Sequence, residues 1–86
     1  MTIYRVEYTP AAARQIRKLN KTVQARLKTQ IAMLSENPRP HGSKKLKGFE
    51  NSYRIRVGDY RVIYEIHDDV LLVLIMKVGP RQDVYN

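Results

Sequence analysis

The sequence predicts an α+β fold with the order β-α-α-β-β-β, in which a helical hairpin packs on one face of a mostly antiparallel sheet. Two observations lead to this fold class. Apolar residues recur at spacings of three and four between residues 10 and 35, and at every second position from residue 52 onward. With 86 residues the chain forms a single domain, residues 1–86, with a small core.

One short strand and two helices make up the first half of the chain. Residues 3–8 alternate between two faces, as expected for a strand. Thr9 and Pro10 suit the N-cap and the first position of a helix of about ten residues. Asn20 can end this helix and cap a second one, which runs from about Lys21 to Ser35. Because the connection is so short, the two helices should form an antiparallel hairpin.

Three strands follow a loop at residues 38–48 that is rich in helix breakers and cations. Gly58-Asp59 is a two-residue hairpin turn, and Asp68-Asp69 is a second tight turn. The last strand is apolar on both faces, which predicts a central position in the sheet. The predicted strands are residues 52–57, 60–67 and 70–78.

The composition excludes several classes of protein. Without cysteine the chain has no disulfide, no thiolate metal site and no cysteine nucleophile. His41 and His67 are far apart in sequence and form no metal-ligand pattern, so no metal or other cofactor is expected. The longest apolar run, residues 70–76, is too short to span a bilayer, and residues 1–7 lack the regions of a signal peptide. A cytoplasmic protein is therefore expected.

The charge is strongly positive and unevenly distributed. Sixteen Lys and Arg against eight Asp and Glu give a net charge of +8 and a pI near 10.1. Residues 11–47 contain ten basic residues and one acidic residue, a net +9, whereas residues 48–86 contain five basic and six acidic residues, a net −1. This balance predicts a polyanionic partner, either nucleic acid or an acidic protein.

Pairing across Gly58-Asp59 gathers arginines on one face of the sheet. Arg56 is directly opposite Arg61, and Arg54 lies two residues along on the same face. Like charges at such positions destabilise a sheet, so a sequence selected only for folding would avoid them. Arg81 follows the last strand beside this face, and Tyr85 follows four residues later. Arginine matches phosphate oxygens, so the cluster predicts a phosphate-binding pocket that could stabilise a phosphorane transition state.

The same rule applied to Asp68-Asp69 pairs Arg61 with Met76 and Val62 with Ile75. The arginine face then also contains Ile63, Leu72, Leu74 and Met76, a mixture of cations and apolar groups that suits an anion and a protein partner together. The opposite face forms the predicted core against the helices. It contains Tyr53, Ile55, Val57, Val62, Tyr64, Ile66, Leu71, Val73 and Ile75.

Several segments have a characteristic order and spacing. They are Lys45-Leu46-Lys47-Gly48, Tyr53-Arg54-Ile55-Arg56, Gly58-Asp59-Tyr60-Arg61-Val62-Ile63-Tyr64 and Val78-Gly79-Pro80-Arg81-Gln82-Asp83-Val84-Tyr85. Through them the chain, over essentially its whole length, resembles the RelE/ParE toxin superfamily, and more closely its RelE branch. The ending is the most discriminating of these segments.

The resemblance implies a type II toxin with the RelE-like microbial RNase fold, which enters the ribosomal A site and cuts mRNA there without a metal. In that family the RNA 2′-hydroxyl attacks the adjacent phosphate, leaving a 2′,3′-cyclic phosphate and a free 5′-hydroxyl. A RelB-like antitoxin, the ribosome and mRNA are the implied partners. The family's functional positions correspond to Arg54, Arg56, Arg61, Arg81 and Tyr85. Other cations would hold ribosomal RNA phosphates: Arg14, Arg17, Lys18, Lys21, Arg26, Lys28, Lys44, Lys45 and Lys47.

Two departures from the family pattern affect the expected chemistry. The residues at positions 54 and 56 are lysines in the best-studied member and arginines here, and arginine is a poor general base because it keeps its proton. The base would then be Tyr85, or catalysis would depend on electrostatics and on the positioning of the RNA by the ribosome. The chain also stops at Asn86, without the C-terminal helix of some members.

Two other functions are compatible with these residues. One is a ParE-like toxin that inhibits DNA gyrase, although members of that branch generally lack the full arginine and tyrosine set. The other is a non-catalytic module that binds RNA or the ribosome, which the arginine replacements leave open.

Overall fold

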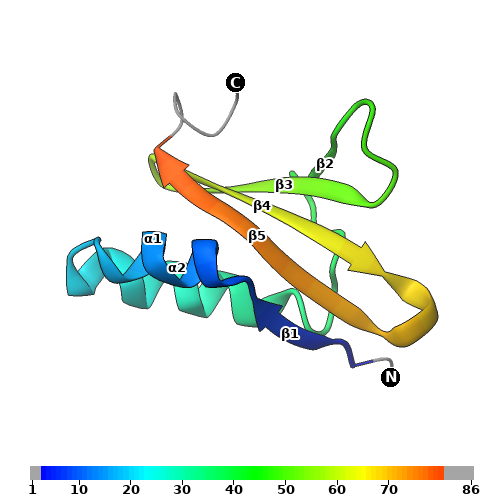
Figure 1. The fold of residues 1–86 in the computed structure, drawn as a ribbon, viewed down its shortest axis with the longest axis horizontal. Coiled ribbons are helices and arrows are strands. Elements are labelled where there is room, and N and C mark those ends of the chain that lie inside the picture. The colour runs from blue at the N-terminus through cyan, green and yellow to red at the C-terminus, as the bar shows by residue number, and fades with distance from the viewer. Residues whose placement is uncertain (1–2, 81–86) are drawn as a thin grey trace.

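The computed structural model describes residues 3–80. Five strands form one mixed sheet of order β1-β5-β4-β3-β2, in which β1 is parallel to β5 and the other pairs are antiparallel (Figure 1). The predicted α+β class and the central position of β5 are therefore confirmed. The elements are β1 (Arg5–Tyr8), α1 (Pro10–Arg17), α2 (Lys21–Met33), β2 (Lys44–Lys45), β3 (Ser52–Val57), β4 (Tyr60–His67), the 3₁₀ turn η1 (Asp68–Val70) and β5 (Leu72–Pro80).

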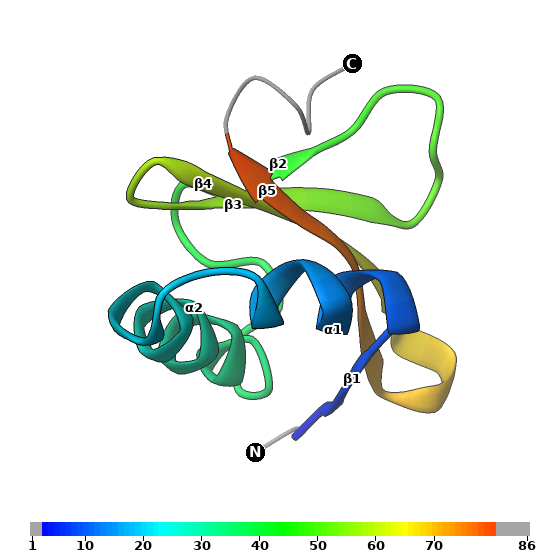
Figure 2. The ribbon, with the colours of Figure 1, turned by 60° about the vertical axis from the view of Figure 1, so that its left-hand side comes forward.

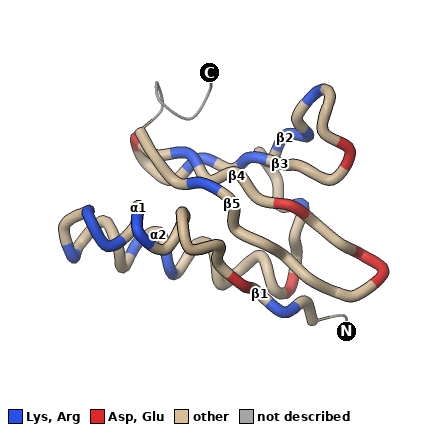
Figure 3. Tube along the Cα trace, in the orientation of Figure 1, with Lys and Arg blue, Asp and Glu red and all other residues tan. Residues whose placement is uncertain are grey.

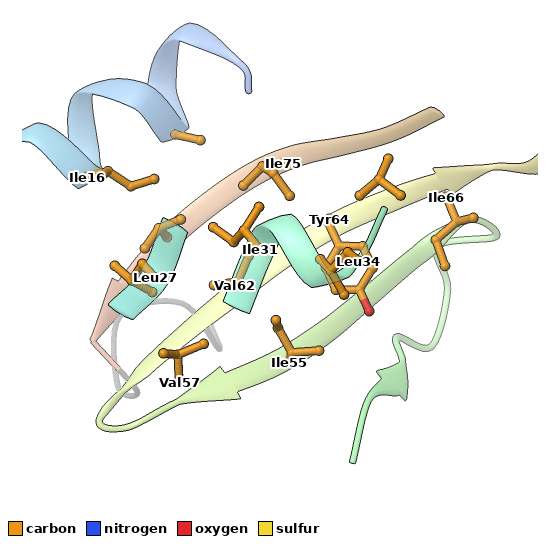
Figure 4. Packing of buried hydrophobic residues seen from close by; sticks show 13 residues of the cluster. Ile16, Leu27, Ile31, Leu34, Ile55, Val57, Val62, Tyr64, Ile66 and Ile75 are labelled. Atoms are coloured by element: carbon orange, nitrogen blue, oxygen red, sulfur yellow. The ribbon is translucent and has the colours of Figure 1, made fainter. Parts of the chain in front are cut away.

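Both helices cover the same face of the sheet, with α1 over β5 and α2 against β3 (Figures 1 and 2). Apolar side chains of the two layers meet between them, as Figure 4 shows for Leu27 and Ile31 of α2 opposite the strands. No helix in residues 3–80 is both long and apolar enough to cross a membrane. The core contains Ala12, Ile16, Leu27, Ile31, Leu34, Ile55, Val57, Val62, Tyr64, Ile66, Val73, Ile75 and Val78.

The predicted helix starts are correct. The Thr9 side chain accepts a hydrogen bond from the Ala12 amide at 3.1 Å, and the Asn20 side chain accepts one from the Val23 amide at 2.9 Å. Each satisfies one of the amides that have no partner within the first helical turn. The helices end earlier than predicted, and after α2 the Ser35 amide bonds to the carbonyl three residues before it rather than four.

The predicted loop at residues 38–48 contains a strand that the sequence did not reveal. Lys44 and Lys45 form β2, pairing with Arg54 and Tyr53 of β3. Two residues are too few to show a strand period, and both side chains are charged, so no hydrophobic alternation marks them.

The segment that leads from α2 to β2 is anchored to the sheet. The Tyr64 hydroxyl donates to the Pro38 carbonyl at 2.7 Å, and the Arg39 guanidinium lies 5.2 Å from the centre of the Tyr53 ring. Arg39 also forms a 2.8 Å ion pair with Asp68, and this bond holds the pKa of the Asp68 carboxyl below its usual value. Burial raises the pKa of the Tyr64 hydroxyl to about 12.

The turn between β4 and β5 is longer than predicted. Residues 68–71 separate the strands, because η1 is followed by Leu71 in the left-handed conformation at φ 51°. His67 therefore pairs with Leu72. Leu71, assigned to the core from the sequence, is instead 43% exposed at this turn.

A β-bulge displaces the rest of this strand pair by one more residue. Tyr64 pairs with Ile75 but Ile63 pairs with Lys77, so β5 has one extra residue here. The predicted pairs Arg61 with Met76 and Val62 with Ile75 are therefore wrong. Gly79 lies opposite Arg61 and Val78 opposite Val62.

Helix α1 provides the hydrogen bonds that β5 needs beyond the end of β1. The Thr9 hydroxyl donates to the Met76 carbonyl at 3.1 Å, and the Gln15 side-chain oxygen accepts from the Val78 amide at 2.7 Å. Because β1 stops at Tyr8, these side chains replace a neighbouring strand at this edge. The bulged segment is therefore fixed by residues about 65 positions earlier in the chain.

Thr9→Ala should reduce the free energy of unfolding by about 2 kcal/mol, because it removes both the N-cap and the bond to β5. Asn20→Ala removes a cap alone and should cost about 1 kcal/mol. Urea denaturation of the two variants measures the difference. Thr9→Ser should behave like the unchanged chain, and equal losses for Thr9→Ala and Asn20→Ala would contradict the double role.

Tyr64→Phe should change how stability depends on alkaline pH. The pKa of Tyr64 is raised on folding, so its contribution is complete below pH 10 and is lost as the pH rises towards about 12. Between these values the unchanged chain should lose about 2–3 kcal/mol more than the variant does. Denaturation at pH 8, 10 and 11.5 measures this, and parallel profiles would contradict the assignment.

Candidate active site

The β3–β4 hairpin positions three arginines as the sequence predicted. Arg56 pairs with Arg61 and Arg54 pairs with Ile63, so all three lie on the face of the sheet opposite the helices. The turn needs Gly58, whose φ is 60°. We call this surface the arginine face.

The arginines differ in exposure. Arg54 and Arg61 are only 3% and 4% exposed, whereas Arg56 is exposed to solvent. Arginine is almost never so deeply buried unless it is paired. Burial limits the number of conformations that these two side chains can adopt, so their positive charges are held in place before any anion binds.

Strand β2 adds a fourth cation to the arginine face. Lys44 lies directly opposite Arg54 and is exposed. Lys44 is one of the predicted RNA contacts, but its place in β2 was not predicted. In the structure it lies beside Arg54, a predicted catalytic residue.

The β-bulge adds a fifth cation, Lys77, which was not among the predicted site residues. Lys77 pairs with Ile63, the residue that also pairs with Arg54, so it belongs to the arginine face. With the regular pairing predicted from Asp68-Asp69, it would have pointed towards the core. The sequence contained one indication that Lys77 faces away from the core: it is the only charged residue between positions 72 and 80.

A cavity of about 500 Å³ lies beside the arginine face, between α2 and the edge formed by β2 and β3. Lys44, Arg54, Arg56 and His41 are among the residues that line it. From the sequence, His41 was of interest only as a potential metal ligand. Its position three residues before Lys44 brings it to the same cavity as two of the predicted catalytic residues.

A second cavity of about 490 Å³ joins Arg56 to Arg26 of α2. The Arg26 guanidinium lies against the hairpin turn, since a Cβ atom on Gly58 would be 3.2 Å from its Nη2. Among the predicted RNA contacts of the helices, Arg26 is therefore the one that shares a described cavity with a predicted catalytic residue.

The other predicted RNA contacts are spread over two regions. All are exposed. One region follows both helices, and the other is the segment of residues 44–47 at β2, which we call the β2 arm (Figure 3). The helical region includes Arg14, Arg17, Lys18, Lys21 and Lys28, and the arm contains Lys45 and Lys47. The structure does not bring these two groups together.

Arg81 and Tyr85, the remaining predicted catalytic residues, lie outside the described residues. Their assignment stays a prediction. Within residues 3–80, no three His, Asp or Glu side chains are grouped closely enough to hold a metal ion.

The chain matches the family described as the ParE toxin of type II toxin–antitoxin systems over residues 6–85. The mRNA interferase toxin RelE of Escherichia coli K12 is 31% identical over 96% of this chain and 90% of its own length. Toxin RelG of Mycobacterium tuberculosis is 30% identical over 96% of this chain and 97% of its own.

The fold is also similar to solved structures. The toxin in the crystal structure of the archaeal RelE–RelB complex from Pyrococcus horikoshii superposes with a TM-score of 0.83 and 32% identity, over 96% of this chain and 99% of that one. The two-helix layer on a mixed sheet is thus the fold of a class of small toxins. The chain belongs to the RelE/ParE family of type II toxins.

Arg56→Thr should increase the stability of the folded chain. Threonine opposite Arg61 removes the like-charge contact, so the free energy of unfolding should rise by about 0.5–1 kcal/mol. Arg56→Lys keeps the charge and should leave stability unchanged. Urea denaturation measures both variants, and a loss of stability in Arg56→Thr would show that the opposed pair does not strain the hairpin.

Proposed function

We propose that the protein is the toxin of a type II toxin–antitoxin system and cleaves mRNA in the ribosomal A site. The observation that carries this proposal is the arginine face, on which Arg54, Arg56 and Arg61 come together in a family whose relatives include a RelE mRNA interferase. Such a density of positive charge on a folded sheet suits RNA phosphate better than a neutral ligand.

In the proposed reaction the 2′-hydroxyl oxygen attacks the neighbouring phosphorus and the bond from phosphorus to the 5′-oxygen breaks. The products are a 2′,3′-cyclic phosphate and a 5′-hydroxyl. Negative charge increases on the phosphoryl oxygens in the transition state, where fixed guanidinium groups would stabilise it. The assigned catalytic set is Arg54, Arg56, Arg61, Arg81 and Tyr85.

Proton transfer is the step that arginines serve least well. Arg54 and Arg56 keep their protons at physiological pH and so bind phosphate rather than act as bases. Tyr85 is then the proposed base, or the ribosome positions the 2′-hydroxyl so well that electrostatic stabilisation is sufficient. A pH–rate profile with Tyr85→Phe separates these two routes.

The exposed cations of the helices and the β2 arm are the proposed contacts to ribosomal RNA. Each phosphate contact adds to the salt dependence of binding, so affinity for the ribosome should fall steeply as salt increases. Because the ribosome is the site of action, the protein would work in the cytoplasm.

A RelB-like antitoxin is the proposed protein partner. The P. horikoshii relative was solved as a RelE–RelB complex. On this chain the antitoxin would cover the basic surface, including the arginine face, and so prevent access to RNA. Complementary negative charge in the antitoxin would speed its association.

Toeprinting on purified ribosomes tests the proposed function. The unchanged protein should cleave within the A-site codon, and Arg81→Ala should slow this cleavage about 100-fold or more, because it removes a charge that stabilises the transition state. Tyr85→Phe should slow it by a similar factor if Tyr85 is the base. Arg5→Ala, on the distant edge strand β1, is the matched control and should cleave normally.

The gyrase alternative has one observation in its favour, since the matching family is described by the ParE name. Labelled thymidine and leucine uptake after induction separates the two functions. Early arrest of leucine uptake supports RNA cleavage, and early arrest of thymidine uptake with continued translation supports gyrase inhibition. A protein that binds ribosomes but yields no cleavage product would be the non-catalytic module.

A further inference from the structure

We propose that Lys77 is a phosphate-binding residue of the arginine face, and that it contacts the RNA phosphate next to the one that is cleaved. This rests on the proposed function and extends it to the path of the RNA across the sheet. It follows from the register of four strands, the fixation of the bulge and the lack of an ion pair between Lys77 and any carboxylate of residues 3–80.

The register aligns three cations in one row across the sheet. Lys44 pairs with Arg54, Arg54 with Ile63, and Ile63 with Lys77. Neighbouring strands are about 4.8 Å apart, so the row is about 14 Å long and the Lys77 backbone lies about 10 Å from that of Arg54. A long lysine side chain can therefore reach a phosphate that neighbours one bound by Arg54.

A second row lies about 7 Å along the strands, where Arg56 pairs with Arg61 and Arg61 with Gly79. Glycine places no side chain beside Arg61 on β5. Lys77 is therefore the only cation that β5 itself contributes between residues 72 and 80. An RNA backbone that crosses the strands would meet Arg56 and Arg61 in the centre and Lys77 to one side.

The bulge gives Lys77 its position, and α1 fixes the bulge. Ile75 and Val78 are both buried, at 0% and 2% exposure, although they are three residues apart. Regular alternation cannot bury both, so the extra residue between them turns Lys77 to the opposite face. The Thr9 hydroxyl donates a hydrogen bond to the Met76 carbonyl, and the Gln15 side-chain oxygen accepts one from the Val78 amide; both hold this segment in place.

The charge of Lys77 is available to an anion. Lys77 is exposed, and no carboxylate within residues 3–80 forms an ion pair with it. Glu65, the carboxylate of β4 on this face, bonds to His67 at 2.9 Å instead. A lysine that only kept the sheet soluble would gain more from an acidic neighbour than from Arg61 on the next strand and Arg54 on the strand beyond it.

Binding of a short fluorescent single-stranded RNA, measured by anisotropy at several salt concentrations, tests the site without requiring cleavage. Lys77→Ala should weaken binding about 5- to 30-fold at low salt and reduce the salt slope by about 0.7, the value for one phosphate contact on a single strand. Lys77→Arg should bind like the unchanged protein. Arg5→Ala removes the same charge from β1 and should lower the slope by much less.

Single-turnover cleavage on programmed ribosomes locates the phosphate. Lys77→Ala should be slower than the unchanged protein on normal mRNA. With a neutral methylphosphonate at one linkage next to the cleaved one, the two proteins should cleave at equal rates. Thermal denaturation of Lys77→Ala and Lys77→Gln checks that both variants are folded.

Two results would overturn the assignment of Lys77: an unchanged salt slope in Lys77→Ala, or a cleavage defect that persists whichever neighbouring linkage is neutral. Failure of the proposed function looks different. In that case the unchanged protein would cleave no mRNA on the ribosome, while Lys77→Ala would still lower the salt slope of RNA binding, which would support the phosphate site.

Discussion

The packing of α2 against the β3–β4 hairpin is the constraint on which the rest of the structure depends. Leu27 and Ile31 occupy the same layer as Ile55 and Val62 (Figure 4). Because strand side chains alternate, a slip of one residue would bury the arginines against the helices and expose the core. The hydrophobic layer thus decides the orientation of the charged face, and the chemistry of that face follows from it.

Two of the arginines combine charge with deep burial. The long side chains of Arg54 and Arg61 lose their conformational freedom when the chain folds, so the proposed binding of RNA phosphate would not have to order them again. The cost falls on the stability of the native state. A chain this small has little stability in reserve, and two N-capped helices on one continuous core help to supply it.

The features that could be predicted from the sequence are those that adjacent residues encode. The turn at Gly58 and the alternation around it are encoded by adjacent residues, so the placement of Arg54, Arg56 and Arg61 was correct. The β4–β5 register depends on Leu71 in a left-handed conformation and on α1 side chains distant in sequence, which a local pattern does not contain. β2 is too short to have a period, so the position of Lys44 opposite Arg54 could not be predicted. The assignments of Arg81 and Tyr85 stay predictions.

In a regular strand, the positions buried in the core also determine which residues face the other side of the sheet. The bulge in β5 separates these two properties. Ile75 and Val78 anchor the strand in the core. Between them, Lys77 faces the other side of the sheet and Met76 is the extra residue of the bulge. Loss of one of these two residues would restore a regular ladder and keep both anchors buried. Related toxins could therefore gain or lose a charge at this point through a single-codon insertion or deletion, with the hydrophobic layer intact.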